Sequence, residues 1–279
     1  MKQFKDKVAV ITGGASGIGL ALARRAAAEG MQLVLADIEQ GPLAAAAAEL
    51  KGAGARVLTV RTDVSRAAEV ENLAAQTLQA FGGAHLVFNN AGVGGVRVKT
   101  WQATAKDWEW VLGVNVWGVI HGVRVFTPIM LRQGDEGHIV NTASAAGFVS
   151  MASTAPYAVS KHAVVTLSEV LYHDLKAENA KVGVSVLCPA WVGTNIWNSQ
   201  RNRPDDLRDR ADTAEERARR EEVRTLLEKG KVTAAEVAAM TFEGIAKDQF
   251  YIFPHPKIRR DIQTRMEDIL ALRNPTRTA

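Results

Sequence analysis

The sequence predicts an α/β fold in which a parallel, doubly wound sheet is covered by helices on both faces. Short runs of apolar, β-branched residues alternate along the chain with longer segments rich in Ala, Leu, Glu and Arg, the order of repeated strand–helix–strand units. The short runs are apolar at almost every position, as strands are when both of their faces are buried. No Pro-, Gly- or Ser-rich linker divides the 279 residues, so we expect a single domain, 1–279.

Six runs have the length and composition of strands, namely residues 8–12, 33–37, 56–60, 85–90, 138–144 and 182–188. The clearest helical segments between them are residues 20–29, 42–51 and 66–80. The charged stretch 195–230 breaks this alternation after the sixth strand, where an insertion lies at the edge at which open α/β sheets bind ligands. We predict a helical lid there, with a passive pair of surface helices as the alternative. A last strand and helix are expected within 249–272.

The composition, 47% apolar and 23% charged residues, is that of an ordinary globular protein. A net charge of +4 and a pI of about 9.2 raise the question of polyanion binding. Between Arg201 and Lys231, however, ten Lys/Arg are interleaved with nine Asp/Glu, so the basic residues form no patch of one sign. We therefore expect no nucleic-acid partner.

The N-terminal residues MKQFKDKVAVITGG enter a strand-like run directly, without a secretory signal, which predicts a cytoplasmic protein. The uncharged apolar run 110–123 has 14 residues, fewer than the roughly 20 that span a bilayer, so no membrane association is expected. Cys188 is the one cysteine of the sequence, so we expect a buried thiol and no intrachain disulfide. The six histidines show neither HExxH nor another metal-binding spacing, and no metal is expected.

A glycine-rich turn follows the first strand, because T-G-G-A-S-G-I-G places Gly13, Gly17 and Gly19 before a helical run. In this context Gly13 allows a tight turn, Gly17 a close backbone approach to a pyrophosphate, and Gly19 close packing of helix on strand. No lysine follows the glycines, so the GxxxxGK[ST] nucleotide loop does not fit. The pattern predicts a dinucleotide site, and the alternative is a tight turn that binds nothing.

The second strand ends at Asp37, which lies 18 residues beyond Gly19. A carboxylate there accepts hydrogen bonds from the ribose hydroxyls of an adenosine and repels a 2′-phosphate. Ser16 and Ile38 stand where a phosphate-binding Arg or Lys could lie, and neither is charged. These residues favour NAD over NADP as the cofactor. The alternative is that Asp37 only caps the next helix.

Two Tyr–Lys pairs with the same spacing occur in one predicted helix. Y-A-V-S-K contains Tyr157 and Lys161, and L-Y-H-D-L-K contains Tyr172 and Lys176. Residues i and i+4 lie on one face of a helix, so each pair could act as a unit. The two tyrosines are about 22 Å apart along such a helix, at 1.5 Å per residue, so both cannot serve one site. The spacing alone does not choose between them.

The sequence resembles the short-chain dehydrogenase/reductase family over residues 7 to about 194, through the TGxxxGxG turn, Asp37, N-N-A-G at residues 89–92, Ser144, and Tyr157 with Lys161. The resemblance implies a Rossmann-type sheet with strand order 3-2-1-4-5-6-7. It also implies a catalytic group of Ser144, Tyr157 and Lys161, extended by Asn115. Tyr157 is selected because Ser144 precedes it by 13 residues, as in the family, whereas the same offset before Tyr172 falls on a valine.

The resemblance further implies which residues hold the cofactor. Beside the glycines and Asp37, they are Ser16, Ile18, Asp63, Val64, Asn90, Ala91, Gly92, Tyr157, Lys161, Pro189, Val192 and Thr194. Asp63 and Val64 match the pair that holds the adenine, although Asp63 could instead cap the following helix. The family usually has Pro-Gly after the sixth strand, whereas this sequence has Pro189 and Ala190, which leaves the backbone geometry there open.

Hydride transfer between a nicotinamide and a ketone or alcohol leaves a proton for the protein to move. A free phenol, with a pKa of about 10, is a poor base at pH 7. We expect the Lys161 ammonium to lower the pKa of Tyr157, which then acts as general acid/base. By resemblance, Ser144 would hold the substrate oxygen and Lys161 would also bind the nicotinamide ribose. Asn115 is expected to bend its helix and hold a proton-relaying water, with a solvent-facing asparagine as the alternative.

The resemblance places mostly apolar residues around the substrate, namely Val93, Gly94, Ala146, Phe148, Val149, Met151, Trp191 and Trp197. They predict an NAD(P)-dependent alcohol dehydrogenase or ketoreductase for a bulky hydrophobic secondary alcohol or ketone, aromatic ones included, beneath a substrate lid at about 195–230. Steroid-type and 3-oxoacyl substrates are alternatives, and some of these side chains could simply pack the core. A regulator that senses NAD without catalysis is the alternative of another class, and the intact Ser144, Tyr157 and Lys161 argue against it.

Four tryptophans crowd the fourth helical region, namely Trp101, Trp108, Trp110 and Trp117. We expect them to pack in the core or at an interface. In the family this helix and the one that bears Tyr157 often form a four-helix contact between subunits, and the last strand can build a tetramer. The resemblance therefore implies a homo-oligomer, either a dimer or a tetramer.

Overall fold

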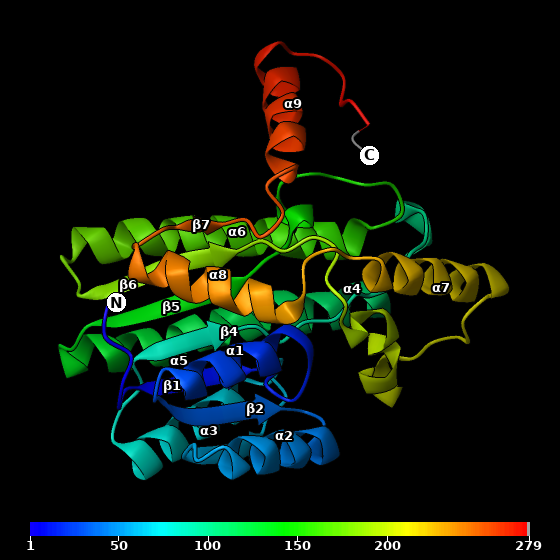
Figure 1. The fold of residues 1–279 in the computed structure, drawn as a ribbon. Coiled ribbons are helices and arrows are strands. Elements are labelled where there is room, and N and C mark those ends of the chain that lie inside the picture. The colour runs from blue at the N-terminus through cyan, green and yellow to red at the C-terminus, as the bar shows by residue number, and fades with distance from the viewer. Residues whose placement is uncertain (278–279) are drawn as a thin grey trace.

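A computed structural model describes residues 1–277, and its strands form one parallel sheet in the order β3-β2-β1-β4-β5-β6-β7 (Figure 1). The strands are β1 (Val8–Thr12), β2 (Gln32–Asp37), β3 (Val57–Arg61), β4 (Leu86–Asn89), β5 (Gly137–Thr142), β6 (Val182–Leu187) and β7 (Tyr251–Ile252). The order reverses between β1 and β4, and a crevice forms at the carboxyl ends of strands at such a point. The predicted α/β fold and strand order are confirmed.

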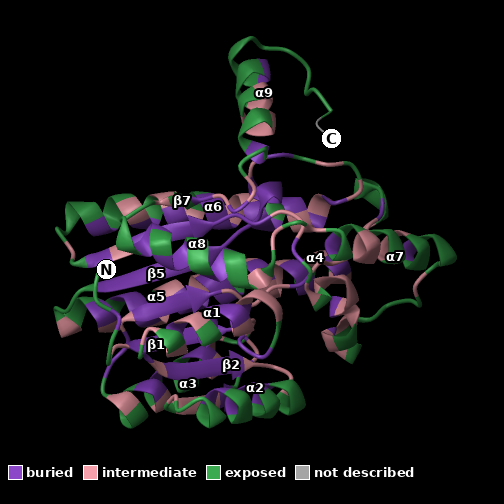
Figure 2. Ribbon diagram, in the orientation of Figure 1, coloured by how far each residue is buried: buried purple, intermediate pink, exposed green. Residues whose placement is uncertain are grey.

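Helices cover both faces of this sheet. They are α1 (Gly17–Ala28), α2 (Gln40–Gly52), α3 (Ala67–Phe81), α4 (Ala105–Leu112), α5 (Gly118–Gln133), α6 (Ala155–Ala177), α7 (Ala214–Glu228), α8 (Ala234–Ala246) and α9 (Ile258–Leu270). One core lies between the sheet and α1, α2 and α8, and a second lies between its other face and α3, α5 and α6. Figure 2 shows the strands buried between these layers, which explains their nearly unbroken apolar sequences.

The strands lie within about two residues of their predicted positions, and the largest difference bears on the site. The fifth strand was expected to end at Ser144, but β5 ends at Thr142. Ser144 instead caps a short 3₁₀ turn, η3 (Ala145–Gly147). Backbone hydrogen bonds continue past the end of β5, from the N–H of Ala143 to the carbonyl of Leu187 (2.8 Å) and from the N–H of Ala145 to the carbonyl of Pro189 (2.8 Å), and they hold the backbone of Ser144 in place.

The longest helical run passes without a break from α4 through a π turn, η2 (Gly113–Trp117), into α5. By length and composition alone, residues 105–133 could cross a membrane. About 44% of the most apolar part of this run is buried inside the fold, and Val119, Phe126 and Met130 belong to its hydrophobic cores. That burial is the pattern of a core helix.

The segment after β6 leaves the sheet before the chain returns to it. It comprises the 3₁₀ turns η4 (Asn195–Asn202) and η5 (Asp205–Leu207), followed by α7, which extends sideways from the body (Figure 1). Thr213 and Glu216 form a capping box at the start of α7, and this local motif determines where the helix begins. In the C-terminal part, β7 pairs with β6 over two residues, and α9 projects away from the body of the molecule (Figure 1).

A glycine at the contact between α5 and β4 gives a first prediction. A Cβ on Gly122 would lie 1.9 Å from Oδ1 of the buried Asn89 side chain. We expect Gly122→Ala to lower the free energy of unfolding by about 2 kcal/mol or more, because helix and strand must move apart. Gly52→Ala in α2 is the matched control, since a Cβ there meets nothing within 4 Å. It should leave stability unchanged or raise it by up to about 1 kcal/mol. Equal urea midpoints for the two variants would contradict this packing.

Candidate active site

A cavity of about 870 Å³ lies at the carboxyl ends of the strands, between the glycine turn, the start of α6 and residues 195–231. Every residue predicted to hold the cofactor lines it, from Gly13 in the turn after β1 to Thr194 in the loop after β6. The pocket residues Val93, Gly94, Ala146, Val149, Met151, Trp191 and Trp197 line it as well. One continuous space thus joins the predicted dinucleotide region to the predicted substrate region.

The glycine turn has the geometry that its sequence predicts. Gly13 and Gly17 have φ values of +66° and +53°, in the left-handed region that favours glycine. A Cβ on Gly19 would lie 2.0 Å from the carbonyl oxygen of Gly13, so only glycine lets α1 start this close to β1. The amino end of α1 therefore faces the cavity with its backbone N–H groups free of side-chain caps, as a pyrophosphate requires. These residues fit a dinucleotide.

Asp37 lies at the cavity wall, where its carboxylate connects two turns. It accepts hydrogen bonds from the backbone N–H of Ala15 (3.1 Å) and of Glu39 (3.1 Å). Burial raises the pKa of Asp37, and these two N–H groups act in the opposite direction. Helix α2 begins only at Gln40, with Glu39 at its N-cap. Asp37 is thus not the cap of α2, and it stands at the cavity wall beside the glycine turn.

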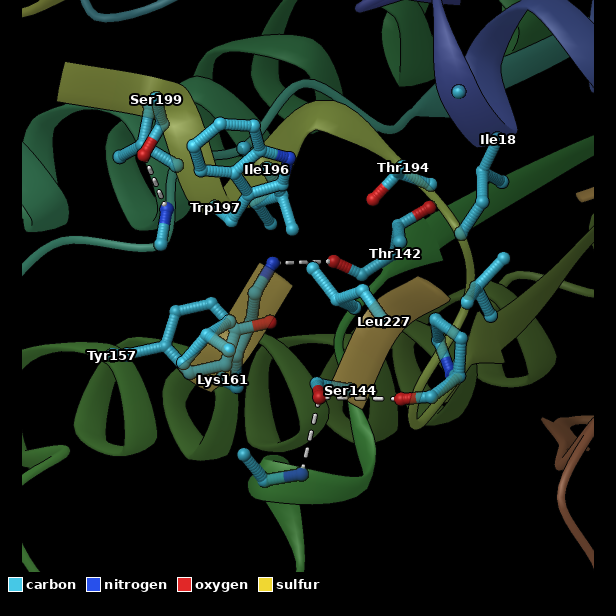
Figure 3. A pocket seen from close by; sticks show the side chains of 18 of the residues that line it. Ile18, Thr142, Ser144, Tyr157, Lys161, Thr194, Ile196, Trp197, Ser199 and Leu227 are labelled. Atoms are coloured by element: carbon cyan, nitrogen blue, oxygen red, sulfur yellow. Dashed lines mark hydrogen bonds between the residues drawn. The ribbon is translucent and has the colours of Figure 1, made fainter. Parts of the chain in front are cut away.

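Ser144, Tyr157 and Lys161 meet on the opposite side of the cavity (Figure 3). The Ser144 hydroxyl donates to the carbonyl of Pro189 (3.2 Å) and accepts from the N–H of Ala146 (3.2 Å). Tyr157 and Lys161 come from the first turns of α6, and the Lys161 ammonium lies 5.7 Å from the centre of the Tyr157 ring. The spacing of four residues thus places both side chains on one face of the helix, toward Ser144.

The proton chemistry of this group differs from the prediction in one respect. Burial raises the pKa of Tyr157, and the contributions that lower it come from the Ser144 hydroxyl and the Arg97 guanidinium. Burial also lowers the pKa of Lys161 to about 8. The Lys161 ammonium donates to the carbonyl of Thr142 (3.0 Å). In this structure the contributions that lower the pKa of Tyr157 thus come from Ser144 and Arg97 rather than from Lys161, whose ammonium is directed to the end of β5.

Asn115 is buried in the π turn η2, so the alternative of a solvent-facing side chain is wrong. Its Oδ1 accepts from the N–H of Val93 (2.8 Å), and its Nδ2 donates to the carbonyl of Val93 (3.0 Å) and to Ser160 Oγ (3.0 Å). The helix is distorted at Asn115, as predicted. The side chain does not line the cavity, and it fixes the loop after β4 to α6.

Two aromatic residues lie away from the cavity. Phe148 was expected in the substrate pocket, but it packs against Tyr251 and Phe253, with ring centres 5.9 and 5.2 Å apart. That prediction is wrong, because the η3 turn rotates Phe148 toward the end of β7 while Ala146 and Val149 face the cavity. Tyr172, the rival tyrosine, packs against Phe250 at 5.2 Å and is likewise absent from the cavity wall.

The loop after β6 is held by a residue that the sequence did not single out. His255 Nδ1 accepts from the N–H of Ala190 (3.1 Å), and its Nε2 lies 3.2 Å from the carbonyl of Trp191. This pair of contacts requires the neutral imidazole with its proton on Nε2, and burial lowers the pKa of His255 accordingly. Ala190 has no positive φ, so alanine suits the position at which the family usually has glycine.

Ser199, Arg201 and Arg203 fix the start of segment 195–230 to the body. Ser199 Oγ accepts from the N–H of Gly94 (3.0 Å, Figure 3). Arg201 makes a two-pronged ion pair with Glu39 at 2.6 Å, and the buried Arg203 pairs with Asp107 at 2.6 Å. These contacts close the segment over the cavity beside Asp37. Partners 162 and 96 residues apart leave no local signal, so sequence analysis could not find them.

Comparison with known proteins agrees with this geometry. The short chain dehydrogenase family model matches residues 7–205. The CLA biosynthesis dehydrogenase/reductase of Lactiplantibacillus plantarum is 32% identical, over 97% of this chain and 95% of the relative. The 1-deoxy-11-beta-hydroxypentalenate dehydrogenase of Streptomyces avermitilis is 36% identical, over 95% of this chain and 89% of the relative.

Among solved structures, a short chain dehydrogenase/reductase from Burkholderia phymatum in complex with NAD is 51% identical and superimposes with a TM-score of 0.97. The match covers 100% of this chain and 99% of the other. Relatives named as dehydrogenases and the complex with NAD support an oxidoreductase with a nicotinamide cofactor. The sequence motifs, the fold and these matches place the chain in the short-chain dehydrogenase/reductase family.

Proposed function

We propose that the protein transfers a hydride between NAD(H) and a bulky, mainly hydrophobic secondary alcohol or ketone, with Tyr157 as general acid/base. The observation that carries this proposal is the meeting of Ser144, Tyr157 and Lys161 in the same cavity as the glycine turn. The glycine turn would hold the pyrophosphate of a dinucleotide, and the three side chains line the same cavity. A regulator that only senses NAD has no need for this group.

Each residue then has a distinct task. The bound nicotinamide supplies or accepts the hydride. Ser144 holds the substrate oxygen, and Tyr157 gives a proton to that oxygen in reduction or takes it in oxidation. Lys161 would bind the nicotinamide ribose, and its ammonium, 5.7 Å from the centre of the Tyr157 ring, would stabilise the tyrosinate by its charge. Asn115 is a positioning residue, because it holds both backbone groups of Val93 at the cavity wall.

Asp37 supports NAD rather than NADP, and a cofactor exchange tests it. Its half-buried carboxylate would lie against a 2′-phosphate, with no free Arg or Lys among its hydrogen-bond partners. We expect Asp37→Ser to lower the ratio of kcat/KM with NADH to that with NADPH by about 10-fold or more, since like-charge contacts cost over 1 kcal/mol. Asp63→Asn is the control and should affect both cofactors alike. An unchanged ratio in Asp37→Ser would remove Asp37 from cofactor selection.

The walls near Tyr157 support a hydrophobic substrate. Val93, Ala146, Val149, Met151 and Trp191 all face the cavity there, and segment 195–230 acts as a lid whose Trp197 faces the same space. One relative is named a 1-deoxy-11-beta-hydroxypentalenate dehydrogenase, a name that gives its substrate a hydroxyl group. Cavities of this kind select by shape and a few polar groups.

The outer face of α5 and α6 supports a homo-oligomer, dimer or tetramer. Trp117, Val159 and Val170 are 53%, 49% and 52% exposed, and the two valines lie on one side of α6. Trp110, by contrast, is buried inside the chain, as expected of a tryptophan that packs in the core. Apolar side chains gathered on one exposed face are a feature of contact surfaces. A cytoplasmic location remains our proposal as well.

Turnover of a ketone panel tests the proposed function. Aryl, alicyclic and long-chain ketones, a 3-oxosteroid and a 3-oxoacyl thioester are each offered with NADH and with NADPH, and the loss of absorbance at 340 nm is followed. We expect turnover with NADH that exceeds turnover with NADPH. Tight NADH binding, measured by fluorescence, without turnover of any ketone or of the corresponding alcohols would favour a sensor instead.

A further inference from the structure

An arginine that sequence analysis did not single out lines the cavity close to Tyr157. Arg97 lies in the extended stretch after β4, between the buried Val96 and Val98. Its guanidinium stacks over the ring of Trp191, with 5.9 Å between Cζ and the ring centre. The charge of Arg97 acts on Tyr157, because it lowers the pKa of that phenol. Arg97 therefore belongs to the substrate side of the cavity, not to the dinucleotide side.

The charged end of Arg97 has no hydrogen-bond or ion-pair partner among the residues that the structure describes. Among residues 1–277 its guanidinium makes no hydrogen bond and no ion pair, and Glu222, whose charge acts on it through space, lies beyond ion-pair distance. Its backbone carbonyl does accept from Arg219 of α7 at 2.9 Å, so the backbone is held in place. A half-buried cation without a partner is costly, and burial lowers the pKa of Arg97 for that reason.

The other cations of the cavity are satisfied or lie in solvent. Arg201 pairs with Glu39, Arg220 pairs with Asp212, and Lys161 donates to a backbone carbonyl. Three further lysines, Lys229, Lys231 and Lys257, are exposed at the rim. Within the part of the chain that the structure describes, Arg97 is thus the half-buried cation of the cavity whose side chain lacks an acceptor and can bind an added anion.

We infer that Arg97 binds a carboxylate of the substrate, so that the preferred substrates are oxo acids and hydroxy acids with an apolar body. A guanidinium stacked on an aromatic ring keeps its N–H groups in one plane, which matches the two oxygens of a carboxylate. The apolar walls contact the body of such a molecule, and Ser144 and Tyr157 hold its reacting oxygen. This inference rests on the proposed function and narrows its substrate class.

Matched acids and amides test it, because they differ in charge and little in shape. The probes are 4-acetylbenzoate with 4-acetylbenzamide, and 5-oxohexanoate with 5-oxohexanamide, each reduced with NADH. For at least one pair, we expect the wild type to prefer the acid by about 10-fold or more in kcat/KM, as charge-assisted hydrogen bonds allow. Arg97→Gln should bring the ratio close to one, because the acid alone loses its partner, whereas the effect of Arg97 on the pKa of Tyr157 acts on acid and amide alike and cancels in the ratio.

Two further variants separate charge recognition from a structural role. Arg97→Lys should keep part of the preference for the acid, because the charge remains but the planar fork is lost. Lys99→Gln is the matched control, since Lys99 is exposed on the same stretch, lies over Trp101 and does not line the cavity. It should leave the acid-to-amide ratio unchanged. If Lys99→Gln lowered the ratio as much as Arg97→Gln, the effect would be one of overall charge and the inference would be wrong.

Binding without turnover distinguishes this inference from the proposed function. The acids are titrated calorimetrically into the NADH complexes of Tyr157→Phe and of Tyr157→Phe with Arg97→Gln. Binding of an acid that is lost in the double variant supports the inference even if the wild type reduces no ketone, in which case only the proposed function fails. Equal turnover of acids and amides, or acid binding that does not depend on Arg97, overturns the inference while leaving hydride transfer intact.

Discussion

Tyr157→Phe is expected to lower kcat by about 100- to 10,000-fold while NADH still binds with unchanged affinity. The change removes only the hydroxyl, the group that we propose to give or take the proton at the substrate oxygen. Phenylalanine keeps the ring beside Lys161 and Ser144, so the walls of the cavity stay in place. Initial rates with the best ketone of the panel and NADH fluorescence titrations measure the two quantities.

Tyr172→Phe is the matched control, since it makes the same change on the same helix, four residues before a lysine. Tyr172 packs against Phe250 and lies outside the cavity, so activity should stay within about 2-fold of the wild type. If Tyr157→Phe kept wild-type turnover, or if Tyr172→Phe lost as much, Tyr157 would not be the general acid/base.

Lys161→Met is expected to lower kcat by about 100-fold or more, because it removes the charge that stabilises tyrosinate and the contact with the nicotinamide ribose. The same substitution should raise the stability of the cofactor-free protein. Burial lowers the pKa of Lys161 from 10.5 to about 8, so the folded state disfavours its charged form. That cost is fully present below about pH 8 and disappears as the pH rises through about 10.5.

The Tm of Lys161→Met should therefore exceed that of the wild type by the largest amount below pH 8. This difference should become smaller between pH 8 and pH 10.5. Lys176→Met is the control, because Lys176 lies 5.3 Å from the centre of the Tyr172 ring with the same spacing on α6, but on the surface. Its activity should be unchanged and its Tm difference flat in this range. A Tm difference for Lys161→Met that is independent of pH would show that Lys161 is not held at a lowered pKa.

Much of the fold could be predicted from the sequence because its signals are local. Doubly buried strands need apolar residues at every position, and the turn after β1 needs glycine at Gly13, Gly17 and Gly19 for reasons of backbone geometry alone. The choice of Tyr157 over Tyr172 followed from the resemblance to the family, in which a serine precedes the tyrosine by 13 residues. In each case the constraint acts on residues that are near in the sequence, so the pattern is visible there.

Contacts between distant segments could not be predicted. The ion pair of Arg201 with Glu39 and the hydrogen bond between Ala190 and His255 depend on how segment 195–230 and the C-terminal segment return to the body. The orientation of Phe148 depends on a 3₁₀ turn that its sequence does not announce. The pKa of Tyr157 depends on burial and on Arg97, a residue that looks like an ordinary surface arginine in the sequence.

Transfer of deuterium from NADH to product tests hydride transfer at this site most directly. NADH that carries deuterium at both C4 positions is incubated with the protein and the ketone that it consumes fastest, and the alcohol is examined by mass spectrometry and NMR. We expect one deuterium on the carbinol carbon with the wild type and with Tyr172→Phe, and no measurable alcohol with Tyr157→Phe. Consumption of NADH without deuterium on that carbon, or labelled alcohol formed equally fast by Tyr157→Phe, would contradict the proposed reaction.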